Sequence, residues 1–314
     1  MSRDRVVGAR PGPVARLGPV TVPATSANLG CLFDCAALAL SPRLRAVAVP
    51  VEGDQIEVLH GGPGGADLPR DGANLVAAGV RAALGGRAGP GLRVTVRSQI
   101  PVGLGLGSSA AAVVAGLLLG NQLAGGGLEQ PTLLGLASEL DGHPDNVAAA
   151  YLGGLTVAAA DGPRVLARRA PVPRRLRVVA LLPEGGVSTA ASRAALPRSY
   201  PRADAVHNLQ RAALLTAEVF SGGFDLSPAL FEDRWHQPQR AAALPGTDSC
   251  LDYRHPDLLG VWLSGSGPSI LALVRGSAEE VAEALMARFR QGGRSCSATV
   301  LGVDNRGARG GRRP

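Results

Sequence analysis

Residues 92–123 limit the possible folds more than any other part of the chain. Residues 92–100 (LRVTVRSQI) alternate between apolar and polar side chains for much of their length, which predicts a strand with one buried face. Residues 101–107 (PVGLGLG) hold three glycines, and residues 108–123 are mostly apolar and carry no charge. A helix of that composition must be buried. We therefore expect helices packed on a sheet, in an α+β or α/β chain.

The glycine loop predicts a site for phosphate. Gly103, Gly105 and Gly107 permit positive φ, so that backbone N–H groups can turn toward one point. The helix that begins at Ser108 and Ser109 aims its unpaired N–H groups and the positive end of its dipole at the same point. The simpler alternative is a glycine turn capped by serine. The strand before the loop and the apolar helix after it favour the phosphate site.

The chain has 314 residues and contains no lysine, so its 32 Lys+Arg residues are all arginine. The absence excludes a Walker-A nucleotide site and a protein kinase, which both need a lysine. It also excludes Schiff-base chemistry. A chain that binds phosphate without lysine must use backbone N–H groups, a helix terminus and a metal ion.

The positive charge is concentrated at the two ends of the chain. Residues 1–16 and 304–314 each carry four arginines and one aspartate, out of a net charge of +7. We expect both segments to be flexible tails around a nearly neutral body. Aromatic residues make up 3% of the chain, which gives nucleic-acid binding little support. The charge-free residues 98–128 hold too many glycines and polar groups for a membrane span.

Strand and helix patterns alternate in both halves of the chain. The four cysteines have no metal-binding spacing and there is no apolar signal core, so we expect a cytoplasmic protein. The Pro/Arg-rich residues 163–175 are taken as a joint between domains at 17–165 and 166–303. The predicted strands are 20–23, 45–51, 55–59, 92–100, 155–159, 177–182, 261–263, 269–274 and 297–303, and the predicted helices are 74–84, 108–123, 130–140, one from 143, 189–196, 203–220 and 278–290.

Three further segments concentrate polar residues. Residues 21–34 (TVPATSANLGCLFD) follow a predicted strand, and residues 263–270 (LSGSGPSI) join two strands through glycines. Glu139 and Asp141 end a predicted helix just before His143, Asp145 and Asn146. Magnesium–nucleotide chemistry needs a carboxylate near the phosphates. Acids at a helix C-terminus also oppose its dipole, a cost that Mg²⁺ would offset.

Together these segments resemble the GHMP small-molecule kinases, most closely the branch that phosphorylates homoserine. The first motif is PATSANLGCLFD (residues 23–34), the second is PVGLGLGSSAA (101–111), a third segment is GHPDN with a later glycine pair (142–146 and 153–154), and the last motif is LSGSGPS (263–269). All occur in order across about residues 20–303. The resemblance implies an N-terminal ribosomal-protein-like α/β domain with a left-handed β-α-β unit and a C-terminal ferredoxin-like α+β domain.

The resemblance also implies phosphorylation of the side-chain hydroxyl of L-homoserine by ATP with Mg²⁺, in a homodimer. Its ATP positions are Asn74, Pro101, Gly103, Leu104, Gly105, Leu106, Gly107, Ser108, Ser109 and Ala110, and its Mg²⁺ ligands are Ser109 and Glu139, with Asp141 close enough to compete. Its substrate positions are Asn28, Asp34, His143, Asp145, Arg193, Arg240 and Gly267. Asn28 and Asp34 would orient the hydroxyl, and either Asp34 or Asp145 would accept its proton.

Two departures from the family pattern stand out. Cys31-Leu32 replaces a usual Pro-Gly, which affects the turn that aims Asp34, and Ser266 replaces a usual alanine. Thr25 stands where the isoprenoid branches of the family have a catalytic lysine.

The first alternative to phosphorylation of homoserine is a kinase of the same fold that acts on another hydroxyl substrate. The second alternative is an RNA-binding protein that uses the arginine-rich tails.

Overall fold

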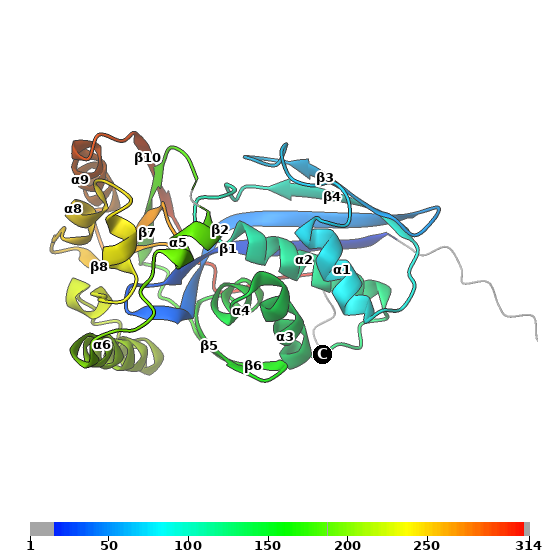
Figure 1. Ribbon diagram of the computed structural model, residues 1–314, viewed down its shortest axis with the longest axis horizontal. Helices are drawn as coiled ribbons and strands as arrows, with labels where there is room; N and C mark the ends of the chain where they lie inside the picture. Colours follow the sequence, from blue (N-terminus) through cyan, green and yellow to red (C-terminus); the bar gives the residue numbers. More distant parts are fainter. Residues whose placement is uncertain (1–15, 187, 311–314) are drawn as a thin grey trace, which may run out of the picture.

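The computed structural model describes residues 16–186 and 188–310, which form two α/β domains side by side (Figure 1). The N-terminal elements are β1 (Leu17–Asn28), β2 (Leu32–Val51), β3 (Ile56–Gly61), α1 (Leu75–Leu84), β4 (Gly91–Ser98), α2 (Ser108–Leu123), α3 (Gln130–Asp141), α4 (Pro144–Leu152), β5 (Leu155–Asp161) and β6 (Arg164–Ala170). The predicted helix 108–123 coincides with α2 at both ends.

The N-terminal sheet has the strand order β3-β4-β2-β5-β6, with β1 paired to β2. Strands β3 and β4 are parallel with α1 between them in sequence, which is the predicted β-α-β unit, and every other pairing is antiparallel. The sheet curves around α1 to α4 (Figure 1). Helix α2 lies at the centre of this arrangement, buried on nearly all sides as its apolar sequence requires.

Helices α1 and α2 pack closely because glycines stand where they cross. A Cβ atom on Gly116 would lie 2.2 Å from the carbonyl oxygen of Val76, and one on Gly120 would lie 2.5 Å from that of Val80. A side chain at either position would push the two helices apart. This contact fixes the axis of α2 and therefore the place of its N-terminus.

The C-terminal domain follows as β7 (Arg177–Pro183), α5 (Thr189–Ala194), α6 (Arg202–Ser221), the 3₁₀ helix η1 (Pro228–Phe231), α7 (Gln237–Ala241), α8 (Thr247–Leu251), β8 (Leu258–Leu263), β9 (Ile270–Val274), α9 (Ala278–Gln291) and β10 (Cys296–Leu301). Its sheet has the order β10-β7-β9-β8 and all pairings are antiparallel. The succession β7-α6-β8-β9-α9-β10 confirms the ferredoxin-like prediction.

The two domains share one core. Along β7, Val179 and Leu181 face a cluster formed with α8 and α9. Val178 and Ala180 point to the other face, as alternate residues of a strand must, and belong to the core that continues into the N-terminal domain. The domains are therefore held together by buried apolar surface as well as by loops.

Two predictions about chain organisation are wrong. Residues 163–175 are not simply a joint, because β6 lies within them and pairs with β5, so the boundary at residue 165 falls inside a strand. Residues 304–310 are not a flexible tail: Gly154 donates to the Asp304 carbonyl at 2.8 Å and Arg309 pairs with Thr21 on β1. Residues 1–15 and 311–314 of the predicted tails lie outside the described residues.

No helix within the described residues is long and apolar enough to cross a membrane. The charge-free residues 98–128 end strand β4, form the glycine loop and helix α2, and enter the turn before α3. The prediction of a buried helix over residues 108–123 is confirmed.

Candidate active site

The glycine loop of residues 101–107 lies between β4 and α2 and turns at each of its glycines. Gly103, Gly105 and Gly107 have φ of 76°, 75° and 68°, the left-handed region that glycine adopts without strain. Gly107 is the N-cap of α2, and no side chain of the described residues caps this helix start. The loop therefore directs the N-terminus of a buried helix at the space in front of it.

The loop packs between strand β1 and the turn that follows β8, which carry the first and the last motif. A Cβ atom on Gly105 would lie 2.3 Å from the carbonyl oxygen of Ser264, and one on Gly107 would lie 1.9 Å from the Thr25 hydroxyl. The Ser264 hydroxyl donates to the Gly105 carbonyl at 2.6 Å. The Thr25 hydroxyl donates to Asn146 Oδ1 at 2.7 Å. Thr25 thus links the first motif to the GHPDN segment.

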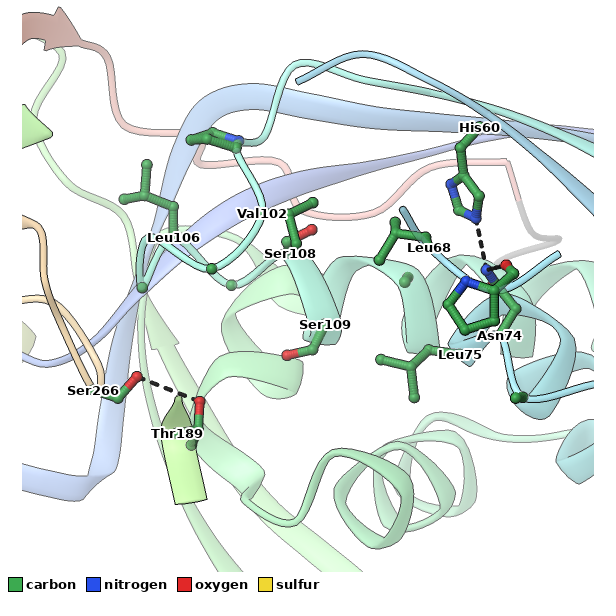
Figure 2. Close-up of a pocket in the computed structure, with 17 residues that line it drawn as sticks. His60, Leu68, Asn74, Leu75, Val102, Leu106, Ser108, Ser109, Thr189 and Ser266 are labelled. Carbon is green, nitrogen blue, oxygen red and sulfur yellow. Dashed lines mark hydrogen bonds between the residues drawn. The ribbon is translucent and has the colours of Figure 1, made fainter. Parts of the chain in front are cut away.

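A cavity of about 380 Å³, called here the loop cavity, opens beside the glycine loop. Figure 2 shows Ser108 and Ser109 near its middle, with His60 and Asn74 at one end and Thr189 and Ser266 at the other. Asn74 is the N-cap of α1: its Oδ1 accepts from the Val76 N–H at 2.9 Å, and its Nδ2 lies 2.6 Å from His60 Nε2. The lining residues predicted from sequence are Asn74, Pro101, Gly103, Gly105, Leu106, Gly107, Ser108 and Ser109.

A second cavity of about 310 Å³, called here the polar cavity, lies on the other side of the loop. It shares Gly105, Gly107 and Ser109 with the loop cavity, so the two are parts of one cleft at the start of α2. The lining residues predicted from sequence include Asn28, Asp34, His143, Asp145, Arg193 and Arg240.

Asp141 lies beside Ser109, whereas Glu139 does not. An interaction with the Ser109 side chain lowers the pKa of the Asp141 carboxyl, but burial is the larger effect and raises it. Glu139 is exposed and lines neither the loop cavity nor the polar cavity. The described residues hold no cluster of three or more His, Cys, Asp or Glu side chains suited to a metal. A Mg²⁺ site here fits one carboxylate and one hydroxyl completed by phosphates and water.

Asp145 is the most deeply buried acid of the polar cavity. One of its oxygens accepts the backbone N–H of Asn146 at 2.6 Å. Burial raises the pKa of Asp145 to about 7, and the nearby charges of Asp34 and Asp141 also act to raise it. A carboxyl group with such a pKa can hold or release a proton near neutral pH.

The turn between β1 and β2 holds Asn28 and Asp34 in strained positions. Their φ angles are 76° and 55°, and the Asp34 N–H donates to Asn28 Oδ1 at 3.1 Å. The departure at Cys31 is accommodated by contact with η1, since the Cys31 thiol donates to the Leu230 carbonyl at 3.1 Å. The turn therefore keeps Asp34 in the polar cavity without the family's usual Pro-Gly.

Two arginines of the C-terminal domain reach the same cavity. Arg193 on α5 donates from Nη2 to both carboxylate oxygens of Asp34 at 2.8 Å. Arg240 on α7 donates from Nη1 to the Gly265 carbonyl at 2.8 Å, and Asn28 Nδ2 donates to the same carbonyl at 3.0 Å. These contacts place two guanidinium groups opposite the carboxylates of the N-terminal domain.

Four predicted site residues lie outside both cavities: Leu104, Ala110, Glu139 and Gly267. Gly267 instead shapes the turn after β8, where its N–H donates to the Ser264 carbonyl at 2.8 Å. Sequence reasoning missed His60 and Thr189 in the loop cavity, because neither lies in a motif. His60 could have been suspected as the polar residue directly after the predicted strand 55–59.

Segments of both domains match models of known protein families. The model of the GHMP kinase N-terminal domain matches residues 73–154, and that of the GHMP kinase C-terminal domain matches residues 220–291. Homoserine kinase from Moorella thermoacetica is 39% identical over 292 residues, which cover 92% of this chain and 98% of the relative. The enzyme of the same name from Desulfitobacterium hafniense is 40% identical with the same coverage. The chain belongs to the homoserine kinase family of GHMP kinases.

The crystal structure of a homoserine kinase from Cytophaga hutchinsonii is similar to this GHMP kinase over the whole fold. The TM-score is 0.81 at 29% identity, and the match covers 92% of this chain and 96% of the other. The predicted family and two-domain fold are therefore confirmed, as is a kinase with an alcohol acceptor. The N-terminal match spans the glycine loop, and the C-terminal match spans the segment that supplies Arg240.

Proposed function

We propose that the protein transfers the γ-phosphoryl group of ATP to the side-chain hydroxyl of L-homoserine and releases O-phospho-L-homoserine, on the route to threonine. The observation that carries the proposal is the single cleft at the start of α2, with the glycine loop on one side and two arginines and the carboxylates of Asp34 and Asp145 on the other. Identification of the phosphorylated product by ³¹P NMR and mass spectrometry tests it.

The loop cavity would hold ATP. The N–H groups of the loop and of the α2 N-terminus suit the phosphates, and the end near Asn74 and His60 suits the nucleoside. Asp141 and Ser109 would hold Mg²⁺, which neutralises phosphate charge when bound. This assignment replaces Glu139, since Asp141 and not Glu139 lines the polar cavity together with Ser109.

The polar cavity would hold homoserine. A guanidinium group pairs with a carboxylate through two parallel hydrogen bonds, so Arg193 and Arg240 suit the α-carboxylate. Asn28, Asp34 and His143 line the same cavity as these arginines. They would orient the amino group and the hydroxyl, so that the oxygen is in line with the γ-phosphoryl group.

Asp145 is the better candidate for the proton acceptor. Both oxygens of Asp34 accept from Arg193, which makes Asp34 a weaker base in this arrangement. Asp145 accepts instead from the backbone N–H of Asn146, and a pKa of about 7 matches the task of taking a proton at neutral pH. Asp145 would take the hydroxyl proton as the oxygen attacks phosphorus.

The resemblance further implies a homodimer in the cytoplasm. Light scattering on the purified protein measures its mass in solution, and about twice the 31.9 kDa of one chain is the expected value.

A further inference from the structure

His236 lies directly behind Arg240, outside the lining of the polar cavity. Its Nδ1 is 3.1 Å from Nη1 of Arg240, and its Nε2 is 3.0 Å from the carbonyl oxygen of Gly30. A guanidinium group can only donate and a carbonyl can only accept. The two contacts therefore fix one tautomer, in which Nε2 carries the proton and Nδ1 accepts the hydrogen bond from Arg240.

The backbone around His236 is held as firmly as its ring. The carboxylate of Asp233 accepts the N–H groups of His236 at 2.9 Å and Gln237 at 2.7 Å, and Asn208 Nδ2 at 2.6 Å. The side chains of His236 and Asp233 are fully buried. Burial lowers the pKa of His236, so the ring is neutral and can accept from a cation.

Phe33 holds the same guanidinium group from a second side. Its ring stacks on that of His236, with centroids 5.0 Å apart and planes at 24°. The guanidinium carbon of Arg240 lies 5.4 Å from the Phe33 centroid, and that of Arg193 lies 5.5 Å from it. Cation–π contact keeps both arginines against this aromatic face.

These contacts use one edge of the Arg240 guanidinium and leave the other free. Nη1 donates to His236 and to the Gly265 carbonyl. Arg240 is 5% exposed, and its buried Nε has no hydrogen-bond partner among the described residues. Nε and Nη2 form the fork that pairs with a carboxylate. An unpaired buried donor is costly, so this edge is suited to a ligand.

We propose that His236 is a positioning residue that holds Nη1 of Arg240, so that the Nε–Nη2 edge faces the α-carboxylate of the amino-acid substrate. The proposal rests on the proposed function. It makes His236, supported by Phe33, a determinant of selectivity for substrates that carry a carboxylate.

Two substitutions separate the two hydrogen bonds of the ring. In His236→Asn the amide oxygen takes the place of Nδ1 and can still accept from Arg240. In His236→Gln the amide reaches the position of Nε2, keeps the bond to Gly30 and loses the acceptor for Arg240. We expect His236→Gln to raise the homoserine KM about ten-fold or more, as loss of a hydrogen bond to a charged group should. His236→Asn should restore most of this loss, and the ATP KM should stay within about two-fold in both.

The decisive comparison uses 3-aminopropan-1-ol, which is homoserine without its carboxylate. Wild type and His236→Gln should phosphorylate this compound with equal kcat/KM, since Arg240 has nothing to bind. His255→Gln, a histidine change outside both cavities, should leave all constants unchanged. If His236→Gln does not fold, Phe33→Leu should show the same selective rise in the homoserine KM.

An equal loss on both acceptors, an equal rise in both KM values, or equal behaviour of the Gln and Asn variants would overturn the role of His236. Failure of the wild type to phosphorylate homoserine at all would instead refute the proposed function.

Discussion

Arg193 and Asp34 form a two-oxygen ion pair across the polar cavity, with Nη2 2.8 Å from each carboxylate oxygen. Arg193 belongs to α5 of the C-terminal domain, and Asp34 follows the β1–β2 turn of the N-terminal domain. The pair therefore joins the two domains at the place where we propose that the substrate binds. A substrate carboxylate would compete with Asp34 for this arginine.

Arg193→Ala should raise the homoserine KM about ten-fold or more and change the ATP KM by less than about two-fold. The stability of the protein should change by less than about 1 kcal/mol, because the two side chains are 41% and 33% exposed and such pairs contribute little. Steady-state kinetics and thermal unfolding check both parts. A large loss of stability with unchanged homoserine KM would show that the pair is structural.

Asp141→Asn should lower kcat about 100-fold or more at saturating ATP, because it removes the carboxylate that we assign to Mg²⁺. Glu139→Gln is the matched control, two positions away on the same helix end and exposed, and should keep nearly normal activity. Titration with Mg²⁺ measures the effect. If Glu139→Gln loses activity and Asp141→Asn does not, Glu139 is the Mg²⁺ ligand and Asp141 is not. Ser109→Ala should lose activity in the same way as Asp141→Asn.

Asp145 gives the activity a defined dependence on pH. Its carboxylate must be ionised to accept a proton, and burial raises its pKa to about 7, so kcat/KM should fall as the pH drops below about 7. Asp145→Asn should lose about 100-fold or more in kcat and the remaining activity should lack this pH limb. A profile unchanged by the substitution would exclude Asp145 as the base.

The same substitution should increase stability at high pH. The folded-state pKa is raised above the ordinary value of 3.8, so the ionised carboxylate costs stability progressively from about pH 4 to pH 7, and fully above pH 7. An asparagine side chain cannot ionise, so the melting temperature of Asp145→Asn should exceed that of wild type by a few degrees at about pH 8. The difference should shrink toward about pH 4. A constant difference across this range would contradict the raised pKa.

The two ends of the glycine loop should differ in their tolerance of a side chain. Gly103 and Gly107 both have positive φ, but a Cβ on Gly107 would meet the Thr25 hydroxyl at 1.9 Å, whereas one on Gly103 would meet only Gly186 at 3.9 Å. Gly107→Ala should cost about 1 kcal/mol or more beyond Gly103→Ala. Denaturant unfolding measures the difference. Equal losses in the free energy of unfolding would show that the loop shifts to accommodate a side chain at Gly107.

The sequence predicted the loop and its helix well because their signals are local. Each signal lies within one short segment and does not depend on distant residues: the alternation of apolar and polar residues in β4, the glycines of the loop and the apolar run of α2. Only residues 45–51 of the long strand β2 were predicted. In the structure the pairing of β1 shifts by a bulge between Pro23 and Ala24, opposite Pro42.

Other features depend on contacts between distant segments. Strand β6 is rich in arginine, yet Val165 and Ala170 are buried, and only pairing with β5 makes it a strand. Glu139 and Asp141 are two residues apart and so face opposite sides of a helix. Which of them meets Ser109 is decided by how α3 packs on α2. The role of His236 depends in the same way on Gly30, about 200 residues earlier.

The most direct test is ADP release by the purified protein, measured with Mg²⁺ and ATP and one acceptor at a time from homoserine, shikimate, pantoate, mevalonate and galactose. The structure predicts turnover with L-homoserine well above every other acceptor, and the same preference in Glu139→Gln. Comparable turnover with an acceptor that lacks an amino-acid group, or none with homoserine, would contradict the proposed function.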